Sequence, residues 1–236
     1  MDIAGTKFIV VGAGFFGSVM AERIAVELKQ KVLVVEKRAH IGGNSWSEMD
    51  KETGIECHKY GSHIFHTNNP EVMRYLERYD GSLNNYRHRV LSRHDGRIYQ
   101  MPVNLSTIEA LYGSSLTPQA AENLLRRDVE RFDFASSNLE ERALAQVGPR
   151  IYNALIKEYT WKQWGTDPKL LPAHTISRLP VRFSYKSDYF DDPWQGIPRD
   201  GYAAVLKKIL AHPRIDVQLG VDYFAIRGRI PQDCLV

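Results

Sequence analysis

Three glycines near the start of the chain have the types and spacing needed to hold a phosphate group. Gly12, Gly14 and Gly17 form a G-x-G-x-x-G motif between the apolar run 8–11 and a segment with helical spacing. In such a motif the first glycine permits a tight turn, the second admits a pyrophosphate, and the third lets helix and strand pack closely. The N–H groups at the helix N-terminus then attract phosphate. A glycine turn in an unrelated βαβ unit is the alternative.

An acidic residue and a second glycine pair follow at the distances that a dinucleotide site needs. Glu36 ends the apolar run 31–35 and lies 22 residues after Gly14, where a carboxylate accepts hydrogen bonds from ribose hydroxyls. After five intervening residues come Gly42-Gly43, a pattern that resembles FAD enzymes of the glutathione-reductase-like class, although an ordinary loop is also compatible with them. Because Glu36 would repel a 2′-phosphate, the pattern favours FAD over NADP.

The elements that must position these residues can be read from periodicity and capping signals. Asn69-Pro70 and Thr117-Pro118 are typical helix starts, and Asn138 with Glu141 resembles a capping box. Gly148-Pro149 should break and restart a helix. The predicted elements are strands at 8–11, 31–35 and 215–219, a hairpin over 87–101 turned at Asp95-Gly96, and helices at 16–28, from 70 to at least 76, 118–132, 149–163 and 201–211, with loops and short strands over 166–200. This order predicts an α/β fold with a helical middle.

Composition limits the remaining function classes. The 236 residues carry a formal charge of +3 spread along the chain, which favours no nucleic-acid partner. Two cysteines build neither a disulfide framework nor a zinc site, and indicate a cytoplasmic location. The charge-free run 8–21 is shorter than the about 20 residues that span a bilayer, and no basic region of a signal peptide precedes it. The apolar run 234–236 looks like the start of a strand, so we expect a fragment of a longer protein.

Several further motifs occur in one order along the chain. They are Gly61-Ser62-His63-Ile64-Phe65-His66-Thr67 after His58-Lys59-Tyr60, Tyr159-Thr160-Trp161-Lys162-Gln163-Trp164-Gly165, Arg178-Leu179-Pro180-Val181-Arg182-Phe183, Tyr189-Phe190 and Gln195-Gly196-Ile197-Pro198. Together with the FAD pattern, these motifs resemble the UDP-galactopyranose mutase family over essentially the whole chain. The family's chains are longer, and this chain resembles about their N-terminal two thirds.

The resemblance implies an isomerase that interconverts UDP-galactopyranose and UDP-galactofuranose for surface or cell-wall polysaccharides. Reduced FAD forms a covalent N5–sugar adduct in that family, without net redox change, and NAD(P)H is the expected external reductant. The resemblance also implies a cytoplasmic homodimer without membrane insertion. A second phosphate-binding arginine and the closing FAD segment belong to the family's C-terminal part, so we expect no turnover from residues 1–236 alone.

The same resemblance implies an arrangement of domains. It predicts a Rossmann-like FAD-binding part at 1–68, a mostly helical insertion with a hairpin at 69–165, strands of a mixed or antiparallel substrate sheet with a mobile loop at 166–200, and a return to the FAD-binding domain at 201–236.

Residue roles are carried over from the family onto matching positions. His63 and Arg178 are the predicted catalytic residues. The predicted cofactor-binding residues are Gly12, Gly14, Phe16, Gly17, Glu36, Lys37, Gly43, Asn44, Ser62, His63, Ile64, Asp222 and Tyr223. The predicted substrate-binding residues are His88, Tyr159, Thr160, Trp164, Arg178 and Tyr189, with Arg182 as a weaker candidate.

Each of these roles has a structural alternative. His63 could cap a strand end, and with His58 and His66 it could suggest a metal site, which we reject because no Cys, Asp or Glu completes it. Trp164, which should stack on uracil, could instead close the core at a helix end, a place that Trp161 suits as well. Arg178, which should grip the diphosphate, could be a solvated surface arginine.

Two rival functions remain open at this stage. An FAD-dependent oxidoreductase of the amine-oxidase type shares the FAD pattern, but has no use for a uridine-binding segment. An inactive FAD- or nucleotide-binding fragment is the rival that is not an enzyme.

Overall fold

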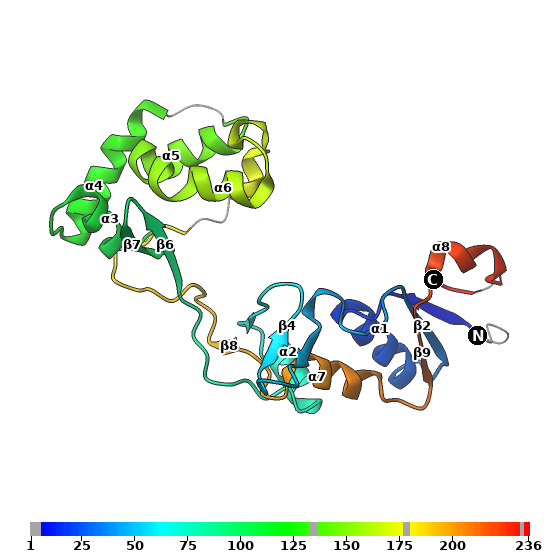
Figure 1. Ribbon diagram of the computed structural model, residues 1–236. Helices are drawn as coiled ribbons and strands as arrows, with labels where there is room; N and C mark the ends of the chain where they lie inside the picture. The colour runs from blue at the N-terminus through cyan, green and yellow to red at the C-terminus, as the bar shows by residue number, and fades with distance from the viewer. Residues whose placement is uncertain (1–5, 133–135, 177–179, 232–233) are drawn as a thin grey trace. The chain divides into compact units, whose positions relative to one another are not determined.

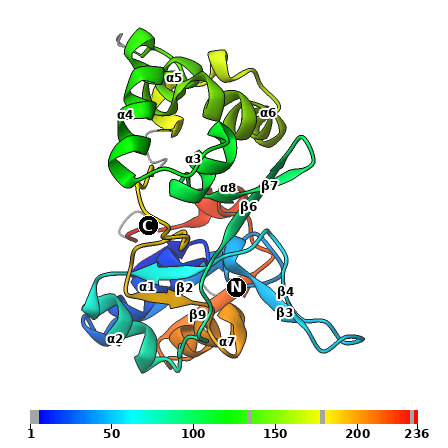
Figure 2. The same ribbon diagram turned by 90° about the vertical axis from the view of Figure 1, so that its left-hand side faces the viewer.

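The computed structural model describes residues 6–132, 136–176, 180–231 and 234–236. The chain forms two units: one comprises residues 1–86 and 192–236, and the other comprises Arg87–Asp191 (Figures 1 and 2). We call them the nucleotide unit and the helical unit. The helical unit is therefore an insertion in the sequence of the nucleotide unit.

The nucleotide unit is built on a parallel sheet with the strand order β1-β2-β9. These strands are Phe8–Val11, Val32–Glu36 and Ile215–Leu219, so β2 is the central strand. Val34 pairs with Val10 on one side and Val217 on the other. Beyond β1, Leu235 pairs with Phe8 in a parallel bridge, as the apolar run at 234–236 suggests. All five residues of β2 are buried, which explains the continuous apolar run of the four residues before Glu36.

Alternate side chains of β2 pack in two separate clusters, each with different helices. Val32 and Val34 pack with Ala21 of α1 (Phe15–Val26) and Leu210 of α7 (Gly201–Leu210). Leu33 and Val35 belong to a separate cluster with Ile226 of the short helix α8 (Tyr223–Ile226). The β-α-β opening expected from the sequence is confirmed, and α1 connects its two parallel strands.

The rest of the nucleotide unit comes from segments far apart in the sequence. The short strands β3 (Ser47–Met49) and β4 (Glu56–His58) form a hairpin, and β5 (Phe65–Thr67) pairs antiparallel with β8 (Trp194–Gly196). Helix α2 (Pro70–Arg78) packs on α7 through Met73 and Leu76. This packing places α2 in the nucleotide unit, whereas we expected the insertion to begin at residue 69.

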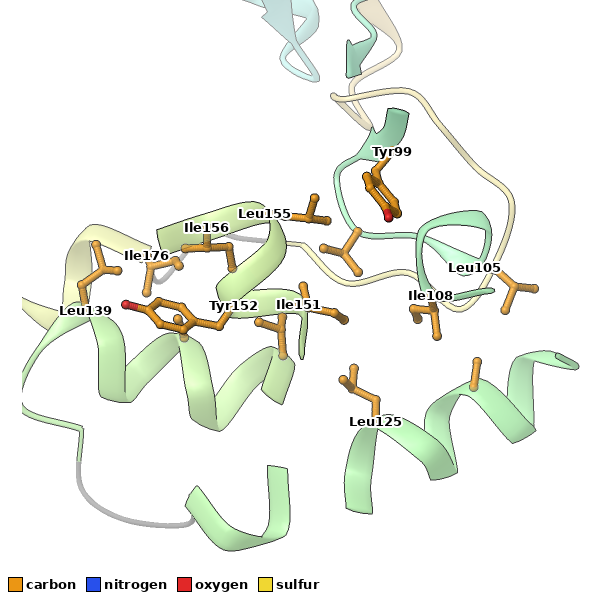
Figure 3. Packing of buried hydrophobic residues seen from close by; sticks show 14 of the residues in the cluster. Tyr99, Leu105, Ile108, Leu125, Leu139, Ile151, Tyr152, Leu155, Ile156 and Ile176 are labelled. Carbon is orange, nitrogen blue, oxygen red and sulfur yellow. The ribbon is translucent and has the colours of Figure 1, made fainter. Parts of the chain in front are cut away.

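The helical unit begins with a hairpin and continues with helices. The elements are β6 (Val90–His94), β7 (Arg97–Met101), α3 (Leu105–Tyr112), α4 (Pro118–Val129), α5 (Leu139–Ile151), a π-helical turn at Tyr152–Ile156, and α6 (Lys157–Trp164). Their buried side chains form one hydrophobic cluster, in which Tyr152 lies among Leu139, Ile156 and Ile176 (Figure 3). The Tyr152 hydroxyl donates to Glu140 across 2.6 Å, so this buried polar group is satisfied.

Local signals account for most helix and turn boundaries. Asn69, Thr117 and Asn138 each accept a backbone N–H of the helix that they start. Gly148 leaves helical geometry at φ 70° and ψ 170°, and Gly165 ends α6 at φ 61°. The expected helix 149–163 is therefore the end of α5, the π turn and α6. In the part of the chain that the structure describes, no helix is long and apolar enough to cross a membrane.

Candidate functional site

The three glycines of the G-x-G-x-x-G motif are required for three different reasons. Gly12 has φ +97°, which side-chain-bearing residues rarely adopt. A Cβ at Gly17 would lie 1.9 Å from the Gly12 carbonyl oxygen, so only glycine fits at this position in the first turn of α1. A Cβ at Gly14 would lie 3.9 Å from the nearest atom of another residue, which is ordinary contact. Packing within the chain therefore does not explain Gly14, while a ligand at the helix N-terminus would.

The second glycine pair lies directly against this turn. Gly42 donates its N–H to the Ala13 carbonyl across 2.7 Å. A Cβ at Gly43 would lie 3.3 Å from the Gly14 Cα. The two motifs are therefore parts of one surface, and Gly43 keeps the approach to Gly14 free of side-chain atoms.

Glu36 is held beside the turn by backbone donors. Its side chain accepts the N–H of Ala13 and the N–H of Arg38, each across 2.8 Å, and the residue is only 7% exposed. A carboxylate offers about four lone-pair sites, so two backbone bonds leave capacity for ribose hydroxyls. The carboxylate is thus oriented before any ligand arrives.

The carboxyl end of the sheet next to Glu36 carries three other predicted cofactor-binding residues. Lys37 and Asp222 form an exposed ion pair at 3.0 Å, and Asp222 also caps α8 by accepting the N–H of Phe224. The Lys37 ammonium and then this backbone N–H lower the pKa of the Asp222 carboxyl. Tyr223 follows in the first turn of α8. Lys37, Asp222 and Tyr223 therefore lie at the carboxyl end of the sheet together with Glu36.

Arg38 is a site residue that sequence reasoning missed. Its Nη2 donates to Asn44, a predicted cofactor-binding residue, across 2.9 Å, and its guanidinium lies 4.4 Å from the centre of the Tyr60 ring. Its Nη1 is buried and has no hydrogen-bond partner in the described part of the chain. A buried guanidinium N–H without an acceptor is costly, so it fits a polar ligand atom such as a phosphate oxygen. Phe16, which is 82% exposed at the start of α1, borders the same turn.

The His63 loop lies between β4 and β5. The His63 ring nitrogen Nδ1 lies 2.9 Å from the Gly61 carbonyl, which can only accept, so Nδ1 carries a hydrogen. The tight turn needs Gly61 at φ +90°. Ser62 is exposed, while His63 and Ile64 are half-buried. The His63 ring is thus held by the Gly61 carbonyl, while the loop is exposed at Ser62, where a ligand could contact its backbone.

The predicted uridine-binding residues occupy α6 in the helical unit. Trp164 and Tyr159 are 56% and 65% exposed, while Thr160 is buried. Trp164 therefore does not close the core. The expectation that Trp161 fills a core position is wrong, because that side chain is 51% exposed. The aromatic face at the end of α6 is available for stacking on a planar ring.

The fold brings His88 and Tyr189 together, although 100 residues separate them in the sequence. The Tyr189 N–H donates to the His88 carbonyl across 3.0 Å, and their ring centres lie 5.4 Å apart. Phe190 stacks on His88 at 5.8 Å. Two predicted substrate-binding residues thus share one aromatic cluster.

Arg182 positions this cluster instead of facing outward. Its side chain is 12% exposed, and its guanidinium donates to the Asp188 carbonyl and, across 2.9 Å, to the Asp191 carboxylate. These bonds occupy the guanidinium fork, so Arg182 orders the segment that carries Tyr189. Arg178 lies outside the described residues. The cofactor group lies in the nucleotide unit, whereas the described substrate group lies in the helical unit.

The fold and these residues define a dinucleotide-binding protein of the Rossmann-like class with an inserted helical unit. A family model described as NAD(P)-binding Rossmann-like domain matches residues 10–79, and the model for UDP-galactopyranose mutase matches residues 154–234.

Curated relatives agree with the second model. The chain is 41% identical to dTDP-fucopyranose mutase of Escherichia coli, over 91% of this chain and 56% of the relative. It is 38% identical to a probable UDP-galactopyranose mutase of Klebsiella pneumoniae, over 92% and 56% of the two chains. The resemblance to the UDP-galactopyranose mutase family is thereby confirmed, and the chain spans little more than half the length of these relatives.

Solved structures confirm the fold class. Reduced UDP-galactopyranose mutase matches with a TM-score of 0.67 at 19% identity, over 90% of this chain and 48% of that one. Cyclohexylamine oxidase from Brevibacterium oxydans matches with a TM-score of 0.55 at 16% identity, over 90% and 51%. At these identities the matches bear on the fold alone, which both enzymes share.

Proposed function

We propose that this chain supplies the FAD-binding part and the uridine-nucleotide-binding part of a UDP-galactopyranose mutase. The observation that carries the proposal is the 38% identity to a probable mutase over 92% of the chain, because that length includes both units. An amine oxidase shares the fold, but it does not need the exposed aromatic face of α6.

The residues of the nucleotide unit fit FAD. Gly14 leaves room at the N-terminus of α1, Glu36 retains acceptor capacity, and Arg38 Nη1 has no acceptor among the residues that the structure describes. We assign the pyrophosphate to the Gly12–Gly17 turn and the adenosine ribose to Glu36. Bound in its reduced form, FAD would supply the nucleophile that takes the sugar from UDP and returns it.

The protein's own contribution is to bind, orient and balance charge. Trp164 would stack on the uracil ring, and Tyr189, ordered by Arg182, would hydrogen-bond a phosphate. Arg178 would stabilise the charge that develops on the departing diphosphate. The His63 loop would lie against the flavin. A cytoplasmic homodimer reduced by NAD(P)H is part of the same proposal.

A second candidate substrate has a specific observation in its favour. The relative with 41% identity is named dTDP-fucopyranose mutase. Thymine differs from uracil by a methyl group, and stacking on an exposed tryptophan tolerates such a change. The base-stacking residue alone therefore accepts both nucleotides.

The test separates cofactor, nucleotide and sugar. The purified chain is titrated with FAD and with UDP, and the complete protein that carries it is assayed with reduced FAD on UDP-galactopyranose, UDP-galactofuranose and dTDP-fucopyranose. We expect FAD and UDP binding, and conversion of the UDP-sugars. If dTDP-fucopyranose alone is converted, the proposed substrate changes from UDP-galactopyranose to dTDP-fucopyranose. Absence of FAD binding would refute the proposal. In the complete protein, Arg178→Ala should lower turnover ~10²–10³-fold.

A further inference from the structure

Two side chains hold the His63 loop through hydrogen bonds to the backbone of His63 itself. His58, at the end of β4, accepts the His63 N–H at its Nδ1 across 3.0 Å. Tyr202, in the first turn of α7, donates its hydroxyl to the His63 carbonyl across 3.1 Å. The rings of His58 and Tyr202 contact each other with centres 5.6 Å apart. The N–H and the C=O of His63 are thus fixed from different elements.

The first of these contacts defines the state of the His58 ring. A backbone N–H can only donate, so Nδ1 must be the acceptor and the ring must be neutral, with its hydrogen on Nε2. Burial lowers the pKa of His58, and the neighbouring His63 lowers it further, whereas Glu56 acts in the opposite direction. The net lowering keeps the ring neutral at pH 7, in the form that can accept.

The contact also sets the direction of a carbonyl. The N–H of His63 and the C=O of Ser62 belong to one planar peptide group, and in a trans peptide they point in opposite directions. Among the described residues the cis bond is Met101–Pro102, so the Ser62–His63 bond is trans. Holding the His63 N–H toward His58 therefore turns the Ser62 carbonyl away from His58. Ser62 as a residue is exposed, so a ligand can reach this part of the loop.

We propose that His58 is a positioning residue of the flavin site: it fixes the Ser62–His63 peptide, and thereby which backbone group the loop presents to the flavin. The inference rests on the proposed function, in which this loop lies against the flavin. Tyr202 supports the same residue from the carbonyl side and contacts Phe15 of the glycine motif at 5.6 Å. The network thus joins the loop to the pyrophosphate turn.

Two variants separate the acceptor from the shape of the ring. His58→Asn places its Oδ1 near the former Nδ1 and keeps an acceptor, but it loses the ring that packs on Tyr202. His58→Phe keeps a flat ring and loses the acceptor. A purely structural role in packing would favour Phe over Asn, whereas the positioning role favours Asn over Phe.

The experiment has one readout without flavin and one with it. In the purified chain, hydrogen exchange at the His63 amide is measured by NMR for the wild type and both variants. We expect exchange at least ~10-fold faster in His58→Phe and near-wild-type exchange in His58→Asn. The same proteins are then loaded with FAD, and the midpoint potential of the bound flavin is measured. A tenfold change in the relative affinity for reduced and oxidised flavin equals about 30 mV for two electrons, and we expect at least this shift in His58→Phe only.

The outcomes distinguish this inference from the function on which it rests. A wild-type chain that binds no FAD would overturn the proposed function and the flavin role of His58 together. If the wild type binds FAD but all three proteins share one potential, the positioning role fails and the proposed function stands. Unchanged exchange in His58→Phe would also overturn it, because the hydrogen bond would then not hold the loop.

Discussion

The Glu36 carboxylate accepts the backbone N–H of Ala13 across 2.8 Å, which joins the end of the central strand to the middle of the glycine turn. Glu36, which we propose binds the ribose, and the turn that we propose binds the pyrophosphate are therefore held at a fixed separation. Because Glu36 is buried and bonded on both oxygens, the site needs little rearrangement to receive a ligand.

Gly14 provides a direct test of the cofactor site. Gly14→Val should fold, because the added Cβ makes only ordinary contact with the chain, but it should abolish FAD binding by filling the pyrophosphate position. Gly228→Val, where a Cβ meets open space, is the matched control and should bind FAD normally. FAD titration followed by flavin absorbance measures both variants. Stoichiometric flavin in Gly14→Val would show that the turn is not the site.

Trp164 tests the nucleotide site. Trp164→Ala should weaken UDP binding by about 1–3 kcal/mol, the usual contribution of base stacking, and leave the melting temperature unchanged because the side chain is half exposed. Trp161→Ala removes an equally exposed tryptophan of the same helix and should leave UDP binding unchanged. Isothermal titration with UDP compares the two. Equal losses would mean that neither tryptophan is specific for the base.

Arg182 tests the ordering of the Tyr189 segment. An ammonium cannot reproduce the guanidinium fork on Asp188 and Asp191, so Arg182→Lys should lower UDP affinity ~10-fold, about 1.4 kcal/mol. Arg87→Lys is the control, because Arg87 is half exposed and its contact with Asp188 is long, at 3.9 Å. If both variants bind UDP like the wild type, the proposed ordering of Tyr189 by Arg182 is wrong.

Glu22 should make the nucleotide unit sensitive to acid. Burial would raise the pKa of Glu22, which is 2% exposed, but the hydrogen bonds of Arg23, Tyr79 and Tyr75 together lower it below 4.5. The carboxylate therefore stabilises the fold above the unfolded-state pKa of about 4.5, and this contribution is lost as the pH falls through the lower folded-state pKa.

The matching variant is Glu22→Gln, which should lower the free energy of unfolding at pH 7 by about 1–3 kcal/mol and flatten its pH dependence below pH 5. Glu27→Gln removes the exposed partner of Arg23 and should change little. Urea unfolding between pH 3 and pH 7 measures both. A Glu22→Gln curve parallel to the wild type would show that the network does not stabilise the fold through the carboxylate.

The sequence by itself determined the elements whose signals are local. Gly12 permits a turn, Asn69 and Thr117 start helices, Gly165 ends one, and Asp95-Gly96 turns the hairpin, each through the conformation or bonding of residues close in sequence. The apolar run 31–35 predicted a buried strand, and β2 is buried throughout. The sequence also contains, in one order, the motifs that resemble the mutase family.

Only the tertiary structure decided the contacts between distant segments. It showed that Gly43 lies against Gly14, that His58 and Tyr202 both hold His63, and that a buried N–H of Arg38 has no acceptor within the described part of the chain. It also showed that the Trp161 side chain is half exposed and that α2 belongs to the nucleotide unit. A side chain's partner is chosen by packing across the fold, and neither composition nor spacing along the chain encodes that choice.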